Sequence, residues 1–193
     1  KIMDDTNVRV NSAKAWFLAA RPKTLTGAAV PVMIGIACAV ALHGVEVRLV
    51  PAVLCMLFAL IMQIDANFVN DYFDFMKGTD DEQRLGPKRA CSQGWITAPA
   101  MRSALLLTTA VACVVGLPLI LYGGWEMILV GLACVVFCFL YTISLSYMGL
   151  GDVLVLVFFG LVPVSMTYWL VAPASPLLSI PLTVIGLSLA CGL

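Results

Sequence analysis

Hydrophobic positions in this chain come in long, almost uninterrupted runs, separated by short polar connections. Each run approaches the roughly 20 residues that a helix needs to cross a bilayer. Helices are favoured because a backbone in lipid has to satisfy its own hydrogen bonds. The pattern therefore predicts an all-α, polytopic membrane bundle with six spans, at about residues 24–42, 49–69, 103–122, 125–144, 153–172 and 177–193.

The connections between the runs differ greatly in length. Residues 172–176 make a short Pro-containing turn, and Gly123-Gly124 separates the third run from the fourth. Residues 71–102, by contrast, form a long polar stretch, which we expect to be a loop that carries the chemistry. The whole chain, 1–193, is interpreted as one transmembrane domain with this loop on its surface.

Composition and charge support a membrane protein and define its orientation. The chain is 62% hydrophobic and 11% charged, whereas roughly 25% of residues are charged in soluble domains. Its 11 basic residues balance 11 acidic ones, so no basic excess exists to bind nucleic acid. All basic residues except Arg48 precede the first run or lie in 71–102. The positive-inside rule therefore predicts that the N-terminus and this loop are cytoplasmic.

The second run ends in a polar face. Helical spacings of three and four place five side chains on that face: Gln63, Asn67, Asn70, Asp71 and Asp74. Polar groups at membrane depth are expensive and indicate a functional site. Capping of a helix end is the alternative interpretation, but the face continues about two turns back into the apolar run, which capping does not need. Asp65 points away from the face, and we interpret it as a structural partner for another helix.

Chemically, this face is an acidic oxygen cluster followed by basic residues. Asp71 and Asp74 would repel each other unless a proton or a cation intervened. Mg²⁺ binds through one or two carboxylates together with substrate phosphates, and arginine matches phosphate oxygens. Four basic residues follow within 15 positions of Asp74: Lys77, Arg84, Lys88 and Arg89. The set predicts a ligand with a diphosphate head and an apolar tail.

These residues resemble a known motif. The stretch Asn70-Asp71-Tyr-Phe-Asp74-Phe-Met-Lys77-Gly78-Thr-Asp80 is similar to the first Asp-rich motif of the UbiA superfamily of intramembrane aromatic prenyltransferases. Three further stretches resemble its 1,4-dihydroxy-2-naphthoate (MenA-type) branch: Arg84-Leu-Gly86-Pro87-Lys-Arg89, Arg21-Pro22-Lys23-Thr24-Leu25, and Gly149-Leu-Gly151-Asp152 with the apolar run to Gly160. The matches run from Arg21 to Trp169.

The resemblance implies a role for each site residue. Asn70, Asp71, Asp74 and Asp80 would hold Mg²⁺ on the diphosphate, with Asp71 and Asp74 as the catalytic pair. Asn67 would line the substrate cavity. The substrate-binding set would be completed by Lys77, Arg84, Lys88 and Arg89. Which basic residue meets the diphosphate stays open, and Lys77 has the alternative of being a solvated charge.

The resemblance also implies a reaction. A polyprenyl group would pass from polyprenyl diphosphate to 1,4-dihydroxy-2-naphthoate and give demethylmenaquinone, a step of menaquinone biosynthesis in the bacterial inner membrane. The family fold has about nine helices and a second Asp-rich motif after the sixth span, which this sequence does not reach. Because residues 189–193 are still apolar, we expect a chain truncated at its C-terminus, and inactive in this form. The segment Tyr141–Tyr147 also lacks the basic residues that related enzymes carry there.

Two other functions compete with this one. A member of the same superfamily would use another aromatic acceptor, such as 4-hydroxybenzoate or haem, but the Lys77-Gly78 and Gly86-Pro87 pairs argue against it. A cation-coupled transporter would bind its ion directly through the same Asp and Asn side chains. Transporters often contain internal repeats, and the sequence shows no second copy of the polar face.

Overall fold

Every element in the described part of the chain is a helix. The computed structural model describes residues 8–44, 47–78, 88–143, 151–172 and 180–192. Within these ranges the long helices are α2 (Leu25–His43), α3 (Leu49–Lys77), α4 (Ala98–Gly116), α6 (Glu126–Ile143), α8 (Val162–Val171) and α9 (Leu182–Gly192). Shorter elements are α1 (Ala13–Ala20), η2 (Pro22–Thr24), η3 (Leu117–Leu119), α5 (Ile120–Gly123), α7 (Gly151–Val155) and the π-helical turn η5 (Leu156–Leu161).

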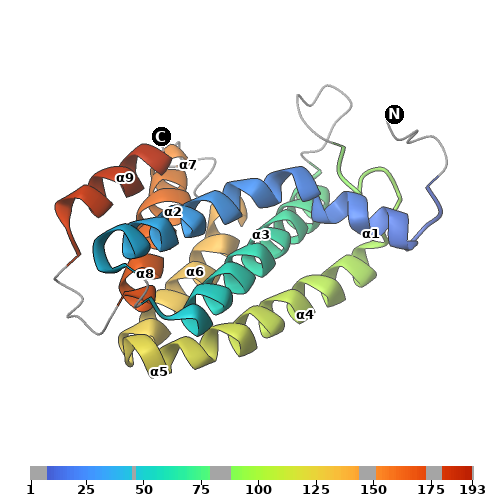
Figure 1. Cartoon of the computed structure of the whole chain (residues 1–193). Helices are drawn as coiled ribbons and strands as arrows, with labels where there is room; N and C mark the ends of the chain where they lie inside the picture. The colour runs from blue at the N-terminus through green and yellow to red at the C-terminus, as the bar shows by residue number, and fades with distance from the viewer. Residues whose placement is uncertain (1–7, 45–46, 79–87, 144–150, 173–179, 193) are drawn as a thin grey trace.

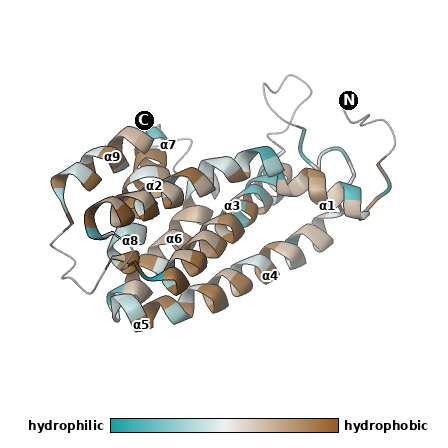
Figure 2. Ribbon diagram, in the orientation of Figure 1, coloured by the Kyte–Doolittle hydropathy of each residue, from teal (hydrophilic) through white to brown (hydrophobic). Residues whose placement is uncertain are grey.

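The helices confirm the membrane bundle. Four helical stretches of the described chain are long and apolar enough to cross a bilayer, namely Ala13–His43, Leu49–Lys77, Ala98–Gly123 and Gly151–Val171. Two shorter apolar helices, Glu126–Thr142 and Leu182–Gly192, lie in the fourth and sixth predicted runs. The protein is therefore a multi-pass integral membrane protein. Hydrophobic residues cover the length of the helices, whereas hydrophilic ones gather where α3 ends beside α1 (Figure 2).

Helix α3 lies at the centre of the bundle. It runs between α2 and α4 (Figure 1) and also contacts α1, α6 and α8. Small residues allow the closest helix contacts. A Cβ added to Gly35 of α2 would lie 2.6 Å from the carbonyl oxygen of Val164 on α8, so the backbones of these two helices meet directly. The central position of α3 lets its polar end contact α6 and the segment that precedes α4.

The helix boundaries differ from the predicted ones around the polar stretch. Helix α3 does not end at residue 69 but continues to Lys77, where Gly78 with φ +65° closes it, so residues 70–77 of the Asp-rich motif belong to the helix and not to the predicted loop 71–102. Helix α4 begins at Ala98 instead of residue 103. The connection is thus shorter than 71–102, and its part 79–87 lies outside the described residues. The polar composition predicted a loop at this point. The partners that satisfy these side chains within the bundle are distant in sequence, so the composition alone does not reveal them.

The N-terminal segment contains a helix that the hydrophobic pattern did not predict. Ser12 caps α1 by accepting the N–H of Ala15 at 3.3 Å, and Arg21, with φ +51°, separates α1 from α2. A positive φ is uncommon for a residue with a side chain, and here it creates a corner. Helix α1 packs there against the end of α3 (Figure 1).

The structure confirms the predicted structural role of Asp65. It is fully buried, and its carboxylate accepts hydrogen bonds from the hydroxyls of Thr108 and Thr109 on α4, the second at 2.9 Å. Two hydroxyl donors compensate part of the cost of burying the group. Asp65 therefore ties α3 to α4, on the side of α3 away from the polar face.

Candidate active site

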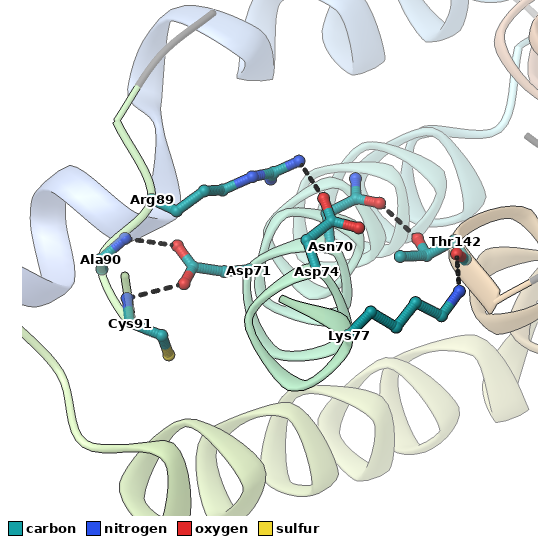
Figure 3. A network of polar contacts seen from close by, with 8 residues as sticks. All are labelled: Asn70, Asp71, Asp74, Lys77, Arg89, Ala90, Cys91 and Thr142. Atoms are coloured by element: carbon teal, nitrogen blue, oxygen red, sulfur yellow. Dashed lines mark hydrogen bonds and ion pairs between the residues drawn. The ribbon is translucent and has the colours of Figure 1, made fainter. Parts of the chain in front are cut away.

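Asp71 faces the segment that follows the predicted loop. Its side chain is fully buried, and its two carboxylate oxygens accept the backbone N–H groups of Ala90 and Cys91 at 2.7 and 2.8 Å. Figure 3 shows this carboxylate directed toward those amides and away from Asp74. Hydrogen bonds to a charged acceptor are about twice as strong as neutral ones, so this contact fixes the segment to α3.

Asp74 lies one turn later and faces Arg89. The guanidinium Nη2 of Arg89 donates to Oδ2 of Asp74 at 2.6 Å, and only 6% and 13% of the two side chains are exposed. The predicted acidic residue and one of the predicted basic residues are therefore neighbours in space (Figure 3). Burial makes the pair strongly coupled, because removal of either partner leaves an uncompensated charge.

Asn70 and Lys77 connect the same end of α3 to α6. Asn70 Oδ1 accepts a hydrogen bond from the hydroxyl of Thr142, and Lys77 Nζ donates to the carbonyl oxygen of Thr142 at 3.1 Å (Figure 3). Thr142 stands near the end of α6. Thr142 therefore forms hydrogen bonds with two polar residues of the Asp-rich motif.

Asn67 faces the corner between α1 and α2. Its Nδ2 donates to the carbonyl oxygen of Ala20 at 2.9 Å and to Oγ1 of Thr24 at 3.0 Å. Gln63, one turn earlier, donates to the same Thr24 hydroxyl at 3.4 Å, while its own Oε1 is buried without a hydrogen-bond partner. The described structure thus places Asn67 against the corner, and its role toward a substrate stays a prediction.

A largely apolar cavity of about 600 Å³ adjoins these residues. Its wall is formed by residues of α2, α3, α6 and the helical stretch Gly151–Val171, together with the stretch from the end of α4 to α5. Polar groups enter the wall mainly through Gln63 and Asn70 of α3 and through Tyr141 and Thr142 of α6. Pockets of this size with a few polar groups are typical of ligand sites. Asn70 belongs both to the Asp-rich motif and to the cavity wall.

The remaining predicted residues are distributed unevenly. Asp80 and Arg84 lie outside the described residues, and Lys88 is exposed. Among the residues that the structure describes, no three His, Cys, Asp or Glu side chains gather into a possible metal site. The structure brings Asp74, Arg89 and Asn70 to one end of α3, and it turns Asp71 and Asn67 to other partners.

Sequence reasoning missed two threonines that organise the site. Thr142 contacts Asn70 and Lys77, and Thr24 receives Gln63 and Asn67. Thr24 lies within a stretch quoted for its family resemblance, but neither threonine belongs to a periodic polar face. A hydroxyl at the end of an apolar helix is too common to be singled out from the sequence.

The sequence is similar to those of several known proteins. The model of the UbiA prenyltransferase family matches residues 28–192. The 1,4-dihydroxy-2-naphthoate octaprenyltransferase of Haemophilus influenzae is 36% identical over 166 residues, which are 81% of this chain and 54% of that protein. The Escherichia coli protein of the same name is 34% identical over 192 residues, 94% of this chain and 62% of that protein.

A eukaryotic relative is similar over much of the same region. Human UbiA prenyltransferase domain-containing protein 1 is 31% identical over 168 residues, 80% of this chain and 46% of that protein. The chain thus spans about half the length of the curated relatives that it matches. No solved structure matches it significantly.

Proposed function

The chain belongs to the UbiA prenyltransferase family, and from this we propose that the protein transfers a polyprenyl group from polyprenyl diphosphate to 1,4-dihydroxy-2-naphthoate. The product is demethylmenaquinol, the reduced form of demethylmenaquinone, because the transfer itself oxidises nothing, and the reaction is a step of menaquinone biosynthesis. The two bacterial relatives bear the name of this activity. The observation that carries the proposal is the position of Asn70, which joins the Asp74–Arg89 end of α3 to the wall of the apolar cavity.

The residues at this end suit a magnesium ion shared with a substrate. Asp74 offers carboxylate oxygens and Asn70 an amide oxygen, and hard oxygen ligands are what Mg²⁺ prefers. Mg²⁺ binds through one or two carboxylates plus phosphate oxygens, so a site with few protein ligands fits it. Asp80, outside the described residues, completes the proposed set. When bound, the ion supplies charge neutralisation for the departing diphosphate.

Arg89 provides the complementary charge. Its planar guanidinium has five N–H donors, which match phosphate oxygens, and in the structure one nitrogen already meets Asp74. We propose that part of this donor set turns to the diphosphate. Lys77, Lys88 and Arg84 are further candidates for that contact. Preorganised donors aimed at developing negative charge are usually the largest single contribution to catalysis.

The apolar cavity serves the other half of the donor. Its walls are almost entirely hydrophobic, so they accept a polyprenyl chain and exclude the water that would quench an allylic cation. In the proposed reaction the allylic C–O bond breaks and diphosphate leaves with the bonding electrons. A ring carbon of the naphthoate then forms the new C–C bond, and the carboxylate departs as CO₂. We propose that the site opens to the cytoplasmic side of the bacterial inner membrane, following the basic residues.

Acceptor choice separates this function from its alternative. The full-length gene product, in proteoliposomes with Mg²⁺ and polyprenyl diphosphate, is offered 1,4-dihydroxy-2-naphthoate and 4-hydroxybenzoate in equal amounts. We expect mass spectrometry to find demethylmenaquinol, with demethylmenaquinone formed from it by oxidation in air, and no prenylated 4-hydroxybenzoate. Prenylation of 4-hydroxybenzoate alone would assign the protein to another branch of the family. A cation-coupled transporter would make neither product.

A further inference from the structure

We propose that Asp71 is a positioning residue, which holds the segment 88–97 against α3 and thereby sets Arg89 against Asp74. The inference rests on the proposed function, because it assigns a role within the same site. The proposal gives different roles to the carboxylates of Asp71 and Asp74, which belong to one motif on one helix. Asp74 serves the ligand, and Asp71 acts through Arg89.

One continuous tripeptide bridges the two carboxylates. Arg89 reaches Asp74 with its side chain at 2.6 Å, and the next two residues give their backbone N–H groups to Asp71 at 2.7 and 2.8 Å. Asp71 and Asp74 stand three positions apart on α3, so the tripeptide follows the helix for about one turn (Figure 3). Arg89 therefore directly precedes Ala90, whose backbone N–H is bound by Asp71.

The segment 88–97 contains hydrogen bonds of its own. Gln93 N–H donates to the carbonyl oxygen of Arg89 at 3.0 Å, and Trp95 N–H donates to that of Ala90 at 2.8 Å. Ala90 and Cys91 are 1% and 4% exposed and pack in a core cluster with residues of α1, α3 and α4. The placement of this segment on α3 is therefore held by apolar packing and by the hydrogen bonds to the buried Asp71 carboxylate.

The direction of the Asp71 carboxylate distinguishes positioning from metal binding. A ligand that shares a cation with Asp74 and Asn70 would turn toward the same space as those side chains. Asp71 instead turns both oxygens to the amides of Ala90 and Cys91 (Figure 3). The carboxylate is also fully buried, whereas Asn70 reaches the cavity wall.

The accessibility of the Cys91 thiol reports whether Asp71 holds the segment 88–97 against α3. We compare the full-length protein with Asp71→Asn and Asp74→Asn, each in a background whose other cysteines are alanine, and measure labelling of Cys91 by a charged maleimide without Mg²⁺ or substrate. An amide at position 71 accepts only one of the two N–H groups, so we expect labelling at least about tenfold faster in Asp71→Asn. In Asp74→Asn the amide contacts persist, and labelling stays within about threefold of the parent. Equal labelling of both variants overturns the proposal.

Kinetics test whether Asp71 acts through Arg89. We expect Asp71→Asn and Arg89→Gln to raise KM for polyprenyl diphosphate by similar factors, and the double variant to be no worse than either alone, because coupled residues are not additive. The Mg²⁺ concentration for half-maximal rate stays within twofold in Asp71→Asn. A tenfold rise of that concentration, or factors that multiply in the double variant, contradicts the proposal.

A second variant removes the contact from the other side. Ala90→Pro deletes one N–H donor and leaves the Asp71 carboxylate intact, so it applies even if Asp71→Asn does not fold. Positioning predicts faster Cys91 labelling and a higher KM for the diphosphate; a metal-ligand role for Asp71 predicts neither, and that result overturns the proposal. Absence of prenyl transfer in the parent protein refutes the proposed function alone, since the labelling experiment requires no turnover.

Discussion

Arg89 and Asp74 form an ion pair of 2.6 Å in which both side chains are largely withdrawn from solvent. One partner belongs to the helix that carries the Asp-rich motif and the other to the segment that returns toward α4. A buried pair is costly to assemble and costly to break, so its presence one helical turn from Asn70, which lines the apolar cavity, favours a functional role. A phosphate ligand would compete with Asp74 for the guanidinium.

Asp74→Asn is expected to abolish most prenyl transfer and leave the protein folded. The substitution keeps the size of the side chain and removes the charge proposed to hold Mg²⁺. Loss of one such electrostatic group costs roughly 10²–10³ in rate. Single-turnover assays measure the loss, and thermal unfolding in detergent monitors the fold. Turnover within tenfold of the parent protein would remove Asp74 from the proposed metal site.

Arg89→Lys separates charge from geometry. Lysine keeps the positive charge but loses the planar fork of donors, so we expect KM for polyprenyl diphosphate to rise several-fold and KM for the naphthoate to stay unchanged. Arg102→Gln provides a control, because Arg102 is an exposed cation on α4. If both variants alter the diphosphate KM equally, the effect reflects general surface charge and not recognition by Arg89.

Thr109→Val tests the structural role of Asp65. The variant removes the hydroxyl that donates to Asp65 at 2.9 Å, and an unsatisfied buried acceptor costs about 1–3 kcal/mol. We expect a lower melting temperature with both substrate KM values unchanged, measured on the same preparation. A change in KM without loss of stability would connect Asp65 to the active site and contradict its interpretation as a tie between α3 and α4.

Sequence reasoning succeeded where the pattern is local. The spacing of Gln63, Asn67 and Asp71 predicts a polar helix face, and all three side chains are buried in the bundle. The end of α3 was misjudged because polar composition outweighed a valid stop signal, Gly78, whose φ of +65° closes the helix. Glycine is the common residue just past a helix end.

The partners of the motif residues could not be predicted. Asp71 binds backbone groups 19 and 20 residues away, and any residue carries a backbone N–H, so no side-chain pattern records the contact. Thr142 lies on α6, 72 positions from Asn70. Such pairings depend on how the helices pack, which the hydrophobic runs do not specify.

Gly35→Ala examines that packing. An added Cβ would lie 2.6 Å from the carbonyl oxygen of Val164, and overpacking costs typically about 1–3 kcal/mol. Gly186→Ala is the control, since nothing lies within 4 Å of its Cβ position. We expect thermal unfolding in detergent to show a lower melting temperature for Gly35→Ala than for the parent protein, and an unchanged melting temperature for Gly186→Ala. Equal melting temperatures would mean that α2 and α8 can separate at little cost.

The central claim is that the end of α3 holds a divalent cation together with a diphosphate, and Mn²⁺ binding tests it most directly. Mn²⁺, which also prefers oxygen ligands, is titrated into the full-length protein and followed by electron paramagnetic resonance, with and without polyprenyl diphosphate; the same donor in protein-free detergent corrects for binding by the diphosphate alone. The account predicts stoichiometric binding only when protein and donor are both present, and its loss in Asp74→Asn. Tight binding that needs no diphosphate, or that survives in Asp74→Asn, would contradict it.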